Sequence, residues 1–124
     1  MLTEHFDISE FDCHDGTEVP EDLLGNVKLL AENLEVLRKE IGKPIHVNSG
    51  YRTPAYNEKI GGEKNSFHKK AMAADITVAG LTPRQVHLAI DRLLLSGKMR
   101  QGGLGLYKTF VHYDVRGVKA RWNG

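Results

Sequence analysis

Hydrophobic side chains recur at steps of three and four over residues 20–41. They are Leu23, Val27, Leu30, Leu34, Leu37 and Ile41. This period predicts an amphipathic helix with a single apolar stripe. Pro20 suits the first turn of that helix, and Gly42 follows its end. We expect the stripe to be a core face rather than a binding face for a partner helix, because a chain of 124 residues needs it for its own core.

A second amphipathic helix is expected to begin at Thr82. Thr82 is a suitable N-cap, Pro83 fits the first helical position, and Gln85 completes a capping box. Gly97 follows the end of this helix, and its apolar face consists of Val86, Ala89, Ile90, Leu93 and Leu94. Thr53-Pro54 carries the same start signal and predicts a further, short helix.

Runs of β-type residues predict the strands. Residues 44–49 alternate in polarity, and a β-branched run, 76–78, follows Asp75. Residues 102–107 and 110–115 predict a hairpin that turns at residues 108–109. Because side chains two residues apart on a strand share a face, those of Phe110, His112 and Asp114 should point the same way.

The length of 124 residues favours one domain, 1–124, in which residues 1–19 form an irregular strap. The strap has three apolar anchors: Phe6, Ile8 and Phe11. The single Cys13 excludes an intrachain disulfide framework. Cys13-His14-Asp15-Gly16 has atoms that could bind a metal, but without further Cys or His nearby we interpret it as a turn.

The charge balance and the hydropathy pattern exclude several classes of partner. A formal net charge of +1 gives no general attraction to nucleic acid or to anionic membranes. The N-terminal stretch lacks the apolar segment of a secretory signal, and no apolar run approaches transmembrane length. We therefore expect no nucleic-acid partner and no membrane insertion. A substrate outside the membrane would be reached by another route, such as cell lysis or a secretion partner.

The candidate chemistry centres on the segment Ser66 to Asp75. His68 and Asp75 stand seven residues apart, and an imidazole nitrogen and a carboxylate oxygen are both good Zn²⁺ ligands. His112 is the candidate for a third ligand, on the hairpin strand that also carries Asp114. Each pair taken alone is more consistent with ordinary hydrogen-bonded side chains, so only a fold that joined the pairs would make a metal site.

Arg52 lies at the corner between the strand 44–49 and the short helix. A planar guanidinium at such a corner could clamp a carboxylate or polarise a carbonyl in a cleft. A surface arginine that pairs with one of the many acids is the alternative.

Three blocks together resemble the zinc D-Ala-D-Ala carboxypeptidase-like family of murein peptidases. They are Ser49-Gly50-Tyr51-Arg52-Thr53-Pro54, Ser66-x-His68-x₆-Asp75 and Phe110-Val111-His112-Tyr113-Asp114. The resemblance covers roughly residues 20–122 and is closest to the small Phe-Val-His-x-Asp subgroup. It implies an α+β hedgehog/DD-peptidase fold, an antiparallel sheet with packed helices. It also implies that His68, Asp75 and His112 bind Zn²⁺, and that Arg52, Ser66 and Tyr107 contact the substrate.

Two positions depart from the family pattern. Ala71 stands where the family motif usually has Gly, a change that is harmful if this position requires a positive φ. Many members carry a general base three residues before the last His, where this chain has Thr109. We assign the base to Asp114 as the nearest acid, and the alternative is that Asp114 orients a metal ligand.

The resemblance implies a zinc metallopeptidase in which Arg52 and Asp114 act with a zinc-activated water. The substrate would be a peptide bond in the peptidoglycan stem or cross-bridge, cut by a carboxypeptidase or an endopeptidase of the D,D or L,D type. A non-catalytic zinc-containing binding module is the rival interpretation, favoured by Thr109. We expect a monomer that is made without a signal peptide and acts on the cell wall, and its origin could be a phage or prophage.

Overall fold

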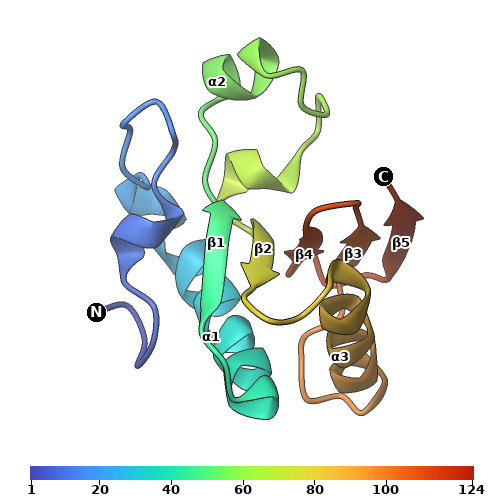
Figure 1. Ribbon diagram of the computed structural model, residues 1–124. Coiled ribbons are helices and arrows are strands. Elements are labelled where there is room, and N and C mark those ends of the chain that lie inside the picture. Colours follow the sequence, from blue (N-terminus) through green and yellow to red (C-terminus); the bar gives the residue numbers. More distant parts are fainter.

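A computed structural model describes residues 1–124 (Figure 1). The helices are α1 (Leu24–Ile41), α2 (Pro54–Lys59) and α3 (Pro83–Leu95). The strands are β1 (Ile45–Ser49), β2 (Ala73–Val78), β3 (Gly103–Leu106), β4 (Val111–Asp114) and β5 (Ala120–Asn123). Short 3-10 turns cover Ile8–Phe11, Glu21–Leu23 and Phe67–Lys70. The expected helices, strands and hairpin are present, and β5 is an additional strand.

The five strands form one sheet in the order β1-β2-β4-β3-β5. The first four are antiparallel to their neighbours, which confirms the predicted α+β class and antiparallel sheet. β5 differs, because it pairs parallel with β3 and makes the sheet mixed at one edge.

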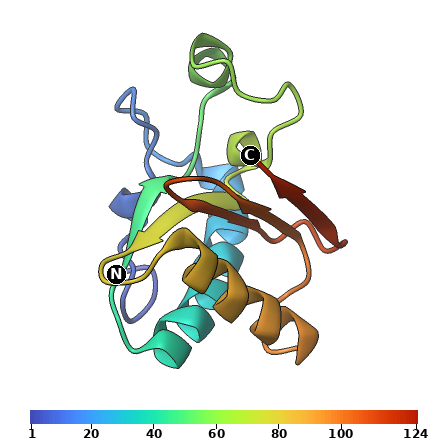
Figure 2. The ribbon, with the colours of Figure 1, turned by 45° about the vertical axis from the view of Figure 1, so that its right-hand side comes forward.

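The helices α1 and α3 cover one face of the sheet, and α2 with the loop that follows it stands on the other side (Figure 2). The predicted stripe of α1 is a core face, with four of its side chains fully buried. The matching core positions of α3 and of the sheet are Val86, Ile90, Leu93, Leu94, Ile76, Leu104, Val111 and Tyr113. The core therefore lies between the two helices and the sheet, and the opposite face is left for other chemistry.

The helix ends follow the expected capping. Thr53 accepts a hydrogen bond from the Tyr56 N–H, with Pro54 in the first turn of α2. Thr82 and Gln85 form the predicted capping box of α3. The first turn of the predicted 20–41 helix is a 3-10 turn, so α1 itself starts at Leu24. No helix has both the length and the hydrophobicity that a membrane span requires.

The strap 1–19 packs against Gly50 and Tyr51, the residues that directly follow β1. Phe6, Phe11 and Cys13 are buried, and the Phe11 carbonyl accepts a hydrogen bond from the Tyr51 N–H at 2.8 Å. Gly50 touches the strap so closely that a Cβ there would lie 2.8 Å from Phe11 Cα. The residues Cys13 to Gly16 form the expected turn, closed by the Gly16 N–H on the Cys13 carbonyl at 2.9 Å.

Ala71 adopts a left-handed backbone conformation, with φ of +56°. It follows the 3-10 turn Phe67–Lys70, and its N–H donates back to the His68 carbonyl. It is the only residue other than glycine with a positive φ. The departure from the family glycine therefore falls on a position where glycine is conformationally favoured.

Candidate metal centre and its cleft

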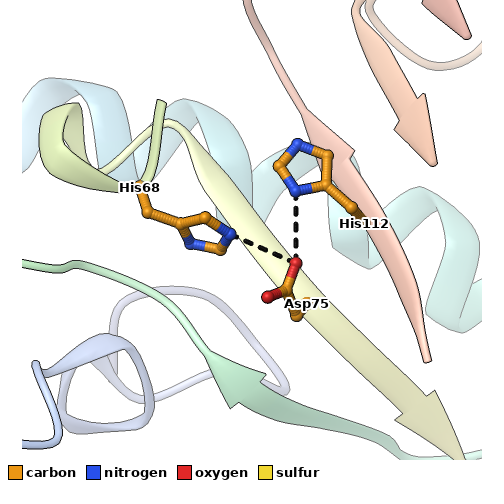
Figure 3. Close-up of side chains that lie close together, drawn as sticks. All are labelled: His68, Asp75 and His112. Atoms are coloured by element: carbon orange, nitrogen blue, oxygen red, sulfur yellow. Dashed lines mark hydrogen bonds and ion pairs between the residues drawn. The ribbon is translucent and has the colours of Figure 1, made fainter. Parts of the chain in front are cut away.

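Asp75 and His112 lie directly opposite each other on the neighbouring strands β2 and β4. Strand alternation turns both side chains away from the helical core, and the turn Phe67–Lys70 brings His68 over the same face. His68 Nε2 and His112 Nδ1 each lie 3.1 Å from Asp75 Oδ1 (Figure 3). One ligand atom from each of the three residues lies within 4.8 Å of the others, and all three residues are buried.

The second nitrogen of each imidazole already has an acceptor. His68 Nδ1–H donates to the Gly50 carbonyl at 2.7 Å, and His112 Nε2–H donates to Asp114 Oδ2 at 2.7 Å. In the neutral tautomers that these partners select, the remaining nitrogens point lone pairs at the Asp75 carboxylate. Two lone pairs that converge on an anionic oxygen need a proton or a metal ion among them. Two imidazole nitrogens and one carboxylate oxygen are a donor set that fits Zn²⁺.

Where protons rather than a metal ion lie between these groups, burial and hydrogen bonds shift their pKa values. Burial disfavours the charged imidazole and lowers the pKa of His68. Burial acts the same way on His112, but hydrogen bonds to Asp114 and Asp75 outweigh it and raise its pKa. Burial alone would raise the pKa of Asp75, yet the hydrogen bonds from His112 and His68 bring it well below its usual range. The carboxylate is therefore ionised at neutral pH, as a metal ligand must be.

Arg52 holds the other oxygen of Asp75, with Nη2 at 3.1 Å from Oδ2. Its Nε–H donates to Ser49 Oγ at 3.2 Å, and Nη1 donates to Asn57 Oδ1 at 3.3 Å. These contacts engage three of the five guanidinium N–H donors. Arg52 is thus fixed at the rim of the cleft with its pairing acid inside the metal group, and it is not a solvated surface arginine.

Asp114 lies behind His112, with no exposed surface. Its Oδ1 accepts from the Gly103 N–H at 2.9 Å and from Arg116 Nε at 2.8 Å. Its Oδ2 accepts from Arg116 Nη2 and from His112, each at 2.7 Å. Against the effect of burial, these donors hold the pKa of Asp114 well below its usual range. This placement favours an orienting role for Asp114 over that of general base.

A cavity of about 790 Å³ opens above the three residues. Ser66 and Tyr107, the predicted substrate contacts, both line it, and Ser66 Oγ also accepts from the His68 N–H at 3.2 Å. The Tyr107 ring stacks on Phe110, with their centroids 4.4 Å apart. Thr109 is exposed in the β3–β4 turn and is not part of the lining.

Two lining residues, Arg116 and Trp122, were not predicted as functional. Trp122 stands in the cleft wall, with its ring 5.0 Å from that of His112. Its Nε1–H donates to the Tyr107 hydroxyl at 2.9 Å. The four-residue strand β5 has no periodic pattern of its own, so only its pairing with β3 places Trp122 here.

The sequence is similar to known proteins over most of its length. A family model described as Peptidase M15 matches residues 4–114. A protein named as a probable peptidoglycan L,D-endopeptidase MepK, from Haemophilus influenzae, is 34% identical over 87 residues. That match covers 64% of this chain and 43% of the Haemophilus protein, so this chain spans less than half the length of that relative.

Proposed function

The chain belongs to the peptidase M15 family, and we propose that it is a zinc-dependent peptidase that cleaves a peptide bond in bacterial peptidoglycan. The observation that carries the proposal is the buried group of His68, Asp75 and His112, with the second nitrogen of each imidazole committed elsewhere. Such a group would hold a divalent cation through three protein ligands, which is the ligand number of catalytic zinc sites.

Zn²⁺ held by these residues would supply Lewis-acid activation of a water and of the peptide carbonyl. The chain's own residues then have distinct tasks. Arg52 has two N–H donors left after its contacts with Ser49, Asn57 and Asp75, and these can stabilise negative charge on the attacked carbonyl oxygen. Asp114 keeps the His112 ring in the tautomer that turns Nδ1 toward the site.

Proton transfer is assigned to Glu63 in place of Asp114. Apart from Asp75, Glu63 is the only carboxylate side chain in the cleft lining, and its loop is fixed by the Asn57 amide on the Glu63 carbonyl at 2.8 Å. A general base contributes about 10²–10⁴-fold to a rate. The variant E63Q should keep its zinc and lose activity by about that factor. The matched control is E58Q, because Glu58 is an exposed glutamate of α2 that does not line the cleft.

The test is a digest of peptidoglycan by the purified, zinc-loaded protein, with mass spectrometry of the fragments and a chelator-treated control. Chelator-sensitive release of a defined amine supports the proposal and identifies the bond. The name of the Haemophilus relative favours an L,D-endopeptidase bond, and the fragments distinguish it from a D,D bond or a carboxypeptidase product. The variants H68A and H112A should lose both zinc and fragment release.

A zinc-containing binding module for the cell wall is the second candidate. It is favoured by the absence of an acid at position 109 and by the complete burial of Asp114. Stoichiometric zinc, binding to peptidoglycan and no fragment release would favour this candidate over the peptidase.

A further inference from the structure

We propose that Arg116 forms a subsite for a carboxylate of the peptide, so that the cleft selects substrates with a free acid next to the bond that is cut. This inference rests on the proposed function and adds the chemical class of the substrate. Its basis is the position of the Arg116 guanidinium, which lines the cleft although its partner Asp114 is buried behind His112.

The guanidinium has two edges that can each bind a carboxylate with parallel N–H groups. The edge formed by Nε and Nη2 is occupied by Asp114, at 2.8 and 2.7 Å. The edge formed by Nη1 and Nη2 has no partner in the chain, and it retains N–H groups on both nitrogens. Arg116 is therefore held rigidly by one edge and offers the other as a preformed fork.

Two aromatic rings flank the same guanidinium. Its Cζ lies 4.3 Å from the centroid of Phe67 and 5.4 Å from that of Trp122. Contacts of this kind restrict the side chain and shield its faces from water, which strengthens an ion pair formed at the remaining edge. The side chain is still 21% exposed, and Arg116 is among the residues that line the cleft.

The charges around the subsite favour an anion once a divalent cation is bound. The cationic side chains of the lining are Arg52, Lys64 and Arg116, and they are balanced by Glu63 and Asp75 in the lining and by Asp114 behind Arg116. A divalent cation at the metal centre would add two positive charges. Field lines concentrate in a cleft of this kind, so a peptide with a carboxylate would be attracted more strongly than its neutral amide.

The chain provides its own reporter for this test, because its single tryptophan is Trp122, which lies against Arg116. The tetrapeptide L-Ala-γ-D-Glu-diaminopimelyl-D-Ala is mixed rapidly with zinc-loaded protein, and the initial amplitude of the tryptophan emission is measured. The same tetrapeptide with its carboxylates converted to carboxamides is the comparison. The acid form should bind more tightly than the amide by about ten- to a hundredfold, as expected for a charge-assisted bidentate pair.

Three variants separate the subsite from a structural role. R116Q removes the charge, and R116K keeps the charge but loses the fork, so both should reduce the preference for the acid form by about tenfold or more. R121Q is the matched control, because Arg121 is similarly exposed, at 24%, but does not line the cleft. Zinc content and the far-ultraviolet circular dichroism spectrum are measured for each variant, and R116K keeps the test usable if R116Q does not fold.

Equal affinity of the wild-type protein for the acid and amide peptides would overturn the inference. So would an undiminished preference in folded, zinc-loaded R116Q or R116K, since that would assign the carboxylate to the metal or to another cation. Because the emission measures binding and not cleavage, an acid preference without turnover would count against the peptidase while it supported the subsite.

Discussion

At the scale of the single residue, Asp114 connects two parts of the site. One of its oxygens accepts from both His112 and Arg116, and the other accepts from Arg116 and a backbone N–H. A carboxylate on the far nitrogen of a ligand imidazole fixes the ring tautomer and raises the basicity of the nitrogen that binds the metal. Asp114 can therefore affect metal affinity without touching the cleft.

The variant D114N should lower zinc affinity by about 10–100-fold. An amide can turn an N–H toward His112 Nε2 and favour the tautomer whose Nδ1 lone pair is lost. Competition with a chromophoric chelator measures the change, and D91N, which removes the partly exposed partner of Arg121, is the control. Unchanged zinc affinity with complete loss of activity would restore Asp114 as the general base.

Substitutions at Ala71 measure the energetic cost of a left-handed backbone beside His68, the candidate metal ligand. In A71G, relief of a strain of about 1–2 kcal/mol is offset by the greater freedom of the unfolded chain and by the loss of a buried methyl group. The free energy of unfolding in urea should therefore stay within about 1 kcal/mol of the wild type. A71V adds a β-branched side chain at a positive φ in a packed site and should lose about 2 kcal/mol or more.

At the scale of the element, β5 completes the cleft through its pairing with β3. The register sets Gly105 against Trp122 on one side and against His112 of β4 on the other. A Cβ at Gly105 would lie 2.4 Å from Trp122 Nε1, so the absence of a side chain there lets the indole approach the metal centre. The glycine thus sets the position of an aromatic wall.

The variant G105A should displace Trp122, shift the tryptophan emission maximum and destabilise the fold by about 1–3 kcal/mol. G25A is its matched control, because a Cβ at that position of α1 meets nothing within 4 Å. Alanine in the first turn of this helix should leave stability unchanged or raise it by up to about 1 kcal/mol. Equal effects of the two variants on the emission maximum would contradict the role given to Gly105.

The elements that sequence reasoning predicted correctly are those with local signals. The stripe of α1 and the capping box of α3 are written within a few residues, and both are confirmed. The strand β5 depends on a long-range parallel pairing with β3, and its four residues contain no local signal that predicts this pairing. The core face of the sheet was also predictable from a local pattern, because alternation along β4 assigns each of its side chains to one face of the sheet.

The residues of the candidate site also fall into those that local sequence signals predict and those that only the fold places there. His68, Asp75 and His112 stand in recognisable sequence blocks. Arg116 and Trp122 enter the cleft only because the pairing of β5 with β3 brings Trp122 beside Arg116, which follows β4. The orienting role of Asp114 could not be separated from a base role by strand alternation, which gives the face but not the depth. Complete burial favours the orienting role, and burial is a property of the assembled structure.

At the scale of the whole molecule, the metal group joins β2, β4 and the turn before β2, so metal binding and folding should be coupled. A ligand at 1,000 times its dissociation constant stabilises the native state by about 4 kcal/mol, which raises Tm by roughly 10–20 °C in a domain of this size. Thermal unfolding at increasing free zinc measures the effect. H68A should show a Tm that does not depend on zinc, and an equal response of H68A would place the metal elsewhere.

The contact between the strap and Gly50 has a consequence for how this domain can be combined with others. The carbonyl of Gly50 orients His68, and the other side of the same residue rests on Phe11. A chimaera that keeps only the residues from Pro20 onward would retain His68, Asp75 and His112. It would lose Phe11, the residue that supports Gly50 behind His68. The unit that recombination or design can move intact therefore begins within the first residues of the strap, well before the first helix.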